Sequence, residues 1–453
     1  MKKKFLMSAI SVAAVALIGA GTAFCFHLRG QYIQEAAADR ETIVEAFRVL
    51  SRGGAAGMLA GMSAPRPRIV LKSGDAQGGV YEFVADADNP DSPKLEFEAK
   101  TSFGPIMGWA LGKYKTKLSL TRAANVDSLW AGALADAGAE IVLSKSLSSD
   151  FDVSLRPIDA EIRPRSAQNG TPLVVKIDKL QYRFDEDLRA YAIHADIPTL
   201  APRASSGPGE SVAPFPSLSG LRIDMKQKRE GKTGSPHTGP ADIRLESFTP
   251  SGGAFSLEDF RFKQDNKAEN GQLNSLCSVK IGKILARNKD LGSFKGNIEL
   301  LRLNADALGG LSAWKTVDRA GKKRLADPFF KSKPTLRLKG WVWKSDSGKT
   351  SLDASLDFED NDEPDMAALV TSGEAKVKTS LKQSGDAFAG DDAASRRKME
   401  ETFKTLAEKG LLISEGGDKY SVSVHLDTTQ KDTLDVNGKT LRVGQALRSL
   451  NER

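Results

Sequence analysis

Apolar and polar residues alternate with a period of two along many short stretches of this chain, and no other feature constrains its fold as strongly. Leu95, Phe97 and Ala99 alternate with charged residues, and the same pattern covers residues 151–155 and 420–426. A period of two places the apolar side chains of a β-strand on one face of its sheet. The sequence therefore predicts an α+β fold that is mainly antiparallel β, with a large curved sheet body and a few packing helices.

Three pairs of predicted strands are joined by turn-forming residues, and each pair is predicted to form a β-hairpin. The turn at Asn437-Gly438 carries the strongest signal, because Asn-Gly readily adopts the positive φ angles of a type I′ turn. The hairpins pair 173–184 with 189–197 around the acidic turn 185–187, 336–344 with 351–358 around 345–348, and the two strands that flank 436–439.

Helices are predicted to be fewer than strands. The clearest begins at Asp391 or Asp392, carries Phe403 on an apolar stripe, and ends at Gly410, since glycine commonly ends a helix. Three further helical segments are predicted at 31–50, 125–134 and 306–314.

An apolar run without charges extends from Phe5 to Phe26, directly after three lysines. Its length suits a helix that crosses a bilayer core of about 30 Å, and the positive-inside rule places the N-terminus in the cytoplasm and the body outside. We therefore predict an uncleaved transmembrane anchor at residues 1–30. Two alternatives are a signal peptide cleaved after Ala23 and a lipoprotein that uses Cys25, against which the bulky Phe24 argues.

The remaining chain is predicted to form a β-rich body in two parts. A helix and strands occupy 31–200, a Pro/Gly-rich loop region occupies 201–240 with one strand at 218–225, and strands with a C-terminal helix and hairpin occupy 241–453. The loop region is the best candidate for a domain boundary, although one continuous sheet with a long loop is the alternative.

The charge and the cysteines exclude some classes of protein. The 65 basic and 58 acidic residues are interspersed and give a net charge of only +7, without the basic stripe and aromatic platforms of a nucleic-acid-binding protein. Cys277 is the only cysteine in the predicted body, so no disulfide within the body is expected.

One pattern recurs in the second half of the chain: an arginine between two apolar residues. On a strand, this places the arginine on the face opposite its neighbours. The simplest interpretation is the solvated face of an amphipathic sheet, and the alternative is a cationic face that meets anionic lipid or glycan. The residues are Arg222, Arg244, Arg261, Arg302 and Arg337.

The short motifs in this sequence that resemble catalytic or metal-binding elements are incomplete, so we predict no catalytic, cofactor-binding or metal-binding residue. Ser347-Gly348-Lys349-Thr350 resembles the end of a phosphate loop, but Trp343 stands where that motif needs glycine. Two Ser-x-x-Lys motifs follow the single Lys-Thr-Gly, which is the wrong order for a penicillin-binding enzyme. The four histidines lack metal-ligand spacing, and the acidic residues at 357–365 lack the spacing of a calcium loop.

The overall layout resembles the YdgA-like family of bacterial inner-membrane proteins of unknown function. The resemblance rests on the lysine-led anchor followed by Gly30-Gln31-Tyr32, on residues 296–308, and on the C-terminal helix, strand and Asn-Gly turn. It implies a bacterial inner-membrane protein with a single pass, a cytoplasmic N-terminus and a periplasmic body that self-associates. It supplies no catalytic residues.

These features lead us to expect a non-enzymatic protein of the cell envelope. It would act as a scaffold or as a lipid-binding or protein-binding module, held to the membrane by its N-terminal helix and without a cofactor. The alternative is an envelope hydrolase that acts on glycan or peptide substrates through acidic residues that the sequence does not identify.

Overall fold

The computed structural model of this protein consists mostly of antiparallel β-strands with few helices, which confirms the predicted fold class at that level. The predicted anchor at 1–30 and the predicted helices at 125–134 and 306–314 lie outside the described residues. Within the described part of the chain, no helix has the length and apolar character needed to cross a membrane. The structure describes residues 31–36, 68–75, 77–84, 94–104, 106–107, 110–124, 137–162, 172–185, 189–203, 217–229, 237–250, 255–286, 289–304, four residues between 321 and 328, 331–358, 370–386, 392–427 and 433–442.

The chain divides into two compact units, and the division falls inside strand β12 (Ala190–Pro202). Unit 1 comprises residues 1–58 and 64–194, and unit 2 comprises residues 59–63 and 195–453. The loop region predicted at 201–240 belongs to unit 2. It contains β13 (Ser217–Arg229), which confirms and extends the strand predicted at 218–225.

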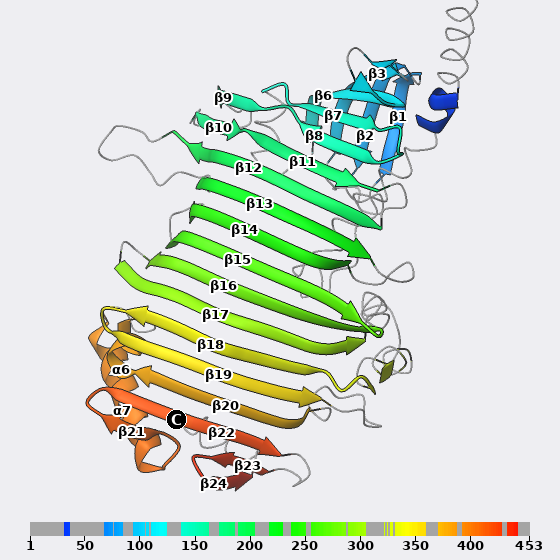
Figure 1. Cartoon of the computed structure of the whole chain (residues 1–453). Helices are drawn as coiled ribbons and strands as arrows, with labels where there is room; N and C mark the ends of the chain where they lie inside the picture. The colour runs from blue at the N-terminus through cyan, green and yellow to red at the C-terminus, as the bar shows by residue number, and fades with distance from the viewer. Residues whose placement is uncertain are drawn as a thin grey trace, which may run out of the picture. The chain divides into compact units, whose positions relative to one another are not determined.

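Unit 1 is an antiparallel meander with the pairing order β1–β2–β3–β6–β7–β8–β11 (Figure 1). Strands β9 and β10 pair with each other, as do the short strands β4 and β5. The bounds are Arg68–Gly74 (β1), Gly78–Val84 (β2), Lys94–Phe103 (β3), Ile106–Met107 (β4), Ala110–Leu111 (β5), Tyr114–Ala124 (β6), Glu140–Lys145 (β7), Phe151–Leu155 (β8), Ile158–Ile162 (β9), Leu173–Ile177 (β10) and Lys179–Phe184 (β11).

The core of unit 1 lies on one side of this meander. Phe97, Tyr114, Leu143 and Phe151, which come from four neighbouring strands, are all buried. Their strands show the predicted alternation, so the buried residues follow from the period-two pattern. A short helix at 31–36, inside the predicted helix 31–50, also contributes a buried tyrosine, Tyr32.

The first predicted hairpin needs a correction, because residues 173–184 do not form one strand. The strand is interrupted at Asp178, and each half has a further partner that was not predicted: β10 also pairs with β9, and β11 also pairs with β8. The acidic turn itself is confirmed, since the Asp185 N–H donates to the carbonyl of Ala190 over 3.1 Å. The apolar pattern of 173–184 is continuous, so sequence alone gave no sign of the interruption or of the additional partners.

Unit 2 is a second antiparallel meander in which each strand from β13 to β20 pairs with the next (Figure 1). Strand β22 follows β20 in the sheet and carries β21 and β23 along its other edge, and β24 pairs with β23. The bounds are His237–Thr249 (β14), Phe255–Glu269 (β15), Gln272–Ala286 (β16), Lys289–Asn304 (β17), Thr335–Ser345 (β18), Gly348–Phe358 (β19), Val370–Ser380 (β20), Ile413–Gly416 (β21), Lys419–Asp427 (β22), Thr433–Val436 (β23) and Lys439–Arg442 (β24).

Two predicted hairpins and the clearest predicted helix of unit 2 are confirmed. β18 and β19 form the hairpin around 345–348, and Asn437 and Gly438 have φ angles of 55° and 81°, as a type I′ turn requires. Helix α7 (Ala393–Glu408) begins after Asp392, whose carboxylate accepts hydrogen bonds from two backbone N–H groups of the first turn. The short helix α6 (Leu381–Ser384), which precedes it, was not predicted.

Candidate functional site: two faces of the unit 2 sheet

The register of unit 2 aligns apolar side chains across ten strands. One row of cross-strand partners runs from β13 to β23 and contains a single polar side chain, Gln264. We call the sheet surface that contains this row the apolar face. The members of the row are Met225, Ala241, Gln264, Cys277, Ile298, Leu338, Ala354, Ala375, Val424 and Val436.

Large side chains flank this row on the same face. Ile223, Ile243, Phe262 and Val279 form a second aligned row, which ends at Gly296. A Cβ atom at Gly296 would lie 2.5 Å from the Trp341 ring, so the glycine leaves room for the indole. The apolar character of the face therefore extends well beyond a single row.

Two tryptophans on β18 satisfy their polar groups and present only apolar ring surface. The Trp341 indole N–H donates to the carbonyl of Asn297 over 2.8 Å, and the Trp343 indole N–H donates to that of Leu291 over 2.6 Å. Trp341 also meets the Phe294 ring edge to face, with ring centres 5.1 Å apart.

Most side chains of the apolar face remain partly exposed. Of the ten-strand row, only Ala241 and Val436 are buried, and the other members are half-buried. Helix α7 reaches one end of the face, where Phe403 meets Tyr420 of β22 with ring centres 5.1 Å apart. Leaving out the short β23, nine strands with eight spacings of about 4.8 Å, each strand about 30 Å long, give a sheet area of roughly 1,100 Å². Soluble monomers usually expose apolar patches of a few hundred Å².

The opposite surface of the sheet, which we call the charged face, brings three of the five predicted arginines together. Arg222 lies directly opposite Arg244, and Arg244 lies directly opposite Arg261. The Asp242 carboxylate accepts hydrogen bonds from Arg244 over 2.8 Å and from Arg261 over 2.7 Å. The hydrogen bond from Arg244 has the largest effect on the pKa of Asp242, followed by that from Arg261. Together they hold this pKa well below its ordinary value, so the carboxylate is ionised throughout the physiological range.

The structure does not bring the other two predicted arginines to this group. Arg337 lies on the charged face but opposite Glu299 of β17. Arg302 has a φ of 58° and stands at a β-bulge, because β17 carries one extra residue between Leu300 and Leu303 relative to β16. Its Nε donates to the carbonyl of Lys333 over 2.8 Å. The prediction that the apolar neighbours of Arg302 share one face is therefore wrong, and a bulge is the reason.

Sequence reasoning missed two cations that continue the arginine row. Lys280 lies opposite Arg261, and Lys295 lies opposite Lys280. Lys280 stands between Val279 and Ile281, so the same apolar–cation–apolar pattern holds with lysine in place of arginine. A search for either basic residue would have found Lys280, whereas Lys295 is followed by glycine and is identified by register alone.

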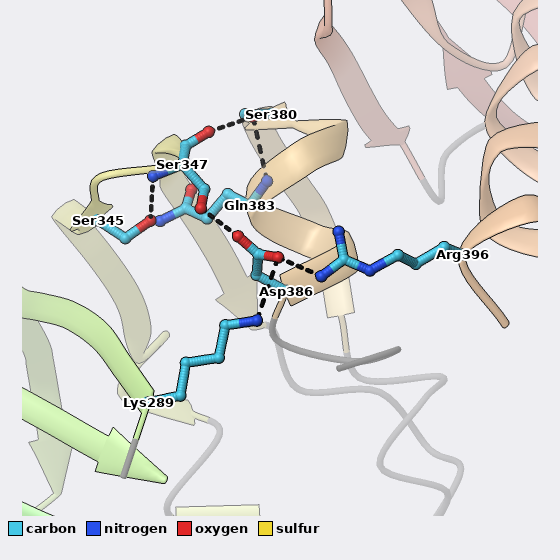
Figure 2. A network of polar contacts seen from close by, with 7 residues as sticks. All are labelled: Lys289, Ser345, Ser347, Ser380, Gln383, Asp386 and Arg396. Carbon is cyan, nitrogen blue, oxygen red and sulfur yellow. Dashed lines mark hydrogen bonds and ion pairs between the residues drawn. The ribbon is translucent and has the colours of Figure 1, made fainter. Parts of the chain in front are cut away.

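A separate polar cluster in unit 2 is centred on Asp386, directly after α6 (Figure 2). Its carboxylate accepts hydrogen bonds from the Ser347 hydroxyl and the Arg396 guanidinium, and Lys289 Nζ lies 3.4 Å away. The Ser347 hydrogen bond, followed by the two cations, holds the pKa of Asp386 below its ordinary value although burial acts in the opposite direction. An ionised carboxylate that contacts two cations is suited to joining β17, α7 and the β18–β19 turn rather than to donating a proton.

Gln383 is the fully buried member of the same cluster. Its side-chain amide donates to the carbonyl of Trp343 over 3.2 Å and accepts from the Thr350 hydroxyl over 2.8 Å. Figure 2 shows the third contact, in which the backbone N–H of Gln383 donates to the Ser380 hydroxyl over 3.2 Å. The residues that resembled a phosphate loop, 347–350, are confirmed as a hairpin turn that this network holds against α6.

The remaining candidates for chemistry are dispersed. His194 lies on β12 and His425 on β22. Burial raises the pKa of the Cys277 thiol, which favours the neutral form. Among the described residues, no three histidine, cysteine or acidic side chains gather in a group that could hold a metal ion. Of the acidic residues at 357–365, the structure describes Asp357, which accepts a hydrogen bond from the Thr335 hydroxyl over 2.6 Å. The acidic residues from 359 onward lie outside the described part of the chain.

Comparison with protein-family models identifies the family of this chain. The model of DUF945, described as a bacterial protein of unknown function, matches residues 137–443, which cover more than half of the chain. YdgA-like proteins fall within this family, so the resemblance stated from the sequence is confirmed. No curated protein matches this chain.

Proposed function

This chain is a member of the DUF945 family, and for it we propose a non-enzymatic role in the bacterial cell envelope: the apolar face of unit 2 binds lipid acyl chains. In this proposal one transmembrane helix at residues 1–30 anchors the chain in the inner membrane, and a large curved sheet body lies in the periplasm. The observation that carries the proposal is the half-buried apolar row that spans ten strands.

Acyl chains suit this face for three reasons. The face is broad, and apolar surface of this extent needs a cover in water. Its central row contains no charged residue, and its two tryptophan N–H groups are already bonded within the sheet, so a bound group needs to offer no hydrogen-bond acceptor. The apolar run at 5–26 is predicted to hold the body beside a bilayer, which is a source of acyl chains.

The first test is lipid extraction from the full-length protein, purified from membranes in a mild detergent that is then exchanged for an amphipathic polymer. Mass spectrometry of the extract should detect phospholipid or fatty acid in at least equimolar amount. Leu338→Glu places a charge in the central apolar row, and it should lose most of this lipid because burying an unpaired carboxylate beside acyl chains is costly.

Val342→Glu is the matched control, since Val342 lies on the same strand with its side chain on the charged face, opposite Lys295. It should retain the lipid. A lipid-free wild-type protein, or equal lipid loss in both variants, would refute the proposal. Native mass spectrometry that shows a dimer, lost only in Leu338→Glu, would assign the face to a second copy of the chain instead.

A further inference from the structure

The charged face carries five cations in one unbroken cross-strand line, which we call the cationic row. Neighbouring members are direct partners in the sheet register, one from each of β13 to β17. Like charges directly opposite each other on a sheet destabilise it, so this arrangement works against folding and calls for another explanation. The members are Arg222, Arg244, Arg261, Lys280 and Lys295.

The nearby carboxylates neutralise the row only in part. Asp242 is shared between Arg244 and Arg261, and Asp196 lies 3.7 Å from Arg222. Lys280 and Lys295 are exposed, and among the described residues neither forms an ion pair. The β13–β15 end of the row is therefore held in a fixed geometry by carboxylates, whereas its β16–β17 end offers two free ammonium groups.

At the β13–β15 end the row is flanked mostly by carboxylates, with Lys263, opposite Asp242, as a flanking cation. Asp224 and Asp242 lie two residues from the row on one side, and Glu246 and Asp259 lie two residues from it on the other. A flat anionic surface would be repelled by these carboxylates while it is attracted by the cations, because charges within a Debye length of about 8 Å all contribute to the local electrostatic potential. A narrow chain that lies along the row would meet the cations first.

We propose that the cationic row binds a linear polyanion that carries phosphate groups along its length. At a strand spacing of about 4.8 Å, the five positions span about 19 Å, which matches an extended chain that crosses the strands at right angles. Arginine side chains bind phosphate through paired N–H groups, and lysine side chains contribute mobile point charges. This site lies on the charged face, opposite the apolar face, so the proposal does not depend on whether the apolar face binds acyl chains.

The test measures binding of long-chain inorganic polyphosphate to the full-length protein at 0.1 M salt. Lys280→Gln combined with Lys295→Gln removes two contacts that stabilise no ion pair, so the protein should fold at least as stably as the wild type. Each phosphate contact raises the binding constant about fivefold at this salt concentration, so the loss of two contacts should lower the affinity about 25-fold. The slope of log K against log salt concentration should decrease in magnitude by roughly 1.4.

The matched control is Lys226→Gln combined with Lys263→Gln, which removes the same charge from exposed positions on the charged face outside the row. It should weaken binding only a few-fold, and Lys280→Arg with Lys295→Arg should restore wild-type affinity. Equal losses in the two glutamine pairs, or no binding of polyphosphate by the wild type, would overturn the proposal. Binding to phosphatidylglycerol vesicles but not to polyphosphate would also overturn it, in favour of a membrane surface.

Discussion

Glu35 provides a sharp test of how the N-terminal helix attaches to unit 1. Its carboxylate lies 2.7 Å from the ammonium groups of both Lys113 and Lys145. The Lys145 side chain is only 3% exposed, and its ammonium lies 4.7 Å from the centre of the Phe151 ring. The helix at 31–36 is thus joined to β7 through a cation that is almost completely out of water.

Glu35→Gln removes the charge while keeping the shape of the side chain. Removing one partner of a fully buried ion pair costs about 3–5 kcal/mol. Because the Glu35 side chain is 27% exposed, water would compensate in part, and we expect about 1–3 kcal/mol. Hydrogen exchange of β6 and β7 amides should therefore accelerate about 5- to 150-fold.

The pH dependence of this effect has a definite sign. Partial burial raises the pKa of Glu35, but hydrogen bonds from Lys113 and Lys145 outweigh it and hold the pKa below its ordinary value. A carboxylate with a lowered folded-state pKa stabilises the protein above its unfolded-state pKa, and this stabilisation is lost as the pH falls through the folded-state value. The difference between wild type and Glu35→Gln should therefore shrink below about pH 4.

Glu98→Gln is the control for this experiment. Glu98 pairs with Lys100 over 3.3 Å on β3, but both side chains are well exposed, and such pairs contribute about 0–1 kcal/mol. Hydrogen exchange in unit 1 should then change little. If Glu35→Gln and Glu98→Gln have the same effect, or if β6 and β7 exchange at the wild-type rate in both, the contact does not hold the helix in place.

Two further predictions concern the polar cluster of unit 2. Gly348 has a φ of 149°, and a Cβ atom there would lie 2.5 Å from Ser380 Cβ. Gly348→Ala should therefore cost about 1–3 kcal/mol, measured by hydrogen exchange of β19 and β20; exchange at the wild-type rate would contradict this. Asp386→Asn should cost about 1.5–3 kcal/mol at pH 7. Because the folded-state pKa of Asp386 is lowered, this difference should begin to shrink below about pH 4 and be lost only as the pH falls through the lowered folded-state pKa; a difference that does not shrink at all on acidification would contradict the ion-pair explanation.

Local patterns predicted the strands and turns of this protein well, because each depends on neighbouring residues. Asn437-Gly438 and the 345–348 turn were found this way, and so was α7 with its cap at Asp392. Register is a property of residues far apart in sequence, and local patterns do not contain it. Sequence reasoning therefore grouped Arg302 with Arg261 although Arg302 stands at a bulge, and it treated 173–184 as one strand although the structure interrupts it at Asp178.

The same limit applies to the candidate site. The period-two pattern predicts that each strand has an apolar side, but not that ten such sides align into one face that stays half-exposed. Lys280 and Lys295 can be assigned to the cationic row only from the register, in which Lys280 is the cross-strand partner of both Arg261 and Lys295. Likewise, the contact between Glu35 and Lys113 joins residues 78 positions apart.

The most direct test of acyl-chain binding places a photoreactive amino acid at Val279 or at Ser278, in the full-length protein within native membranes. These neighbouring residues of β16 point to opposite faces, since Val279 pairs with Phe262 and Ser278 with Lys263. Irradiation at Val279 should yield protein whose intact mass has increased by that of a lipid, whereas irradiation at Ser278 should not. Lipid adducts at neither position, or equally at both, would contradict the assignment of the apolar face to acyl chains.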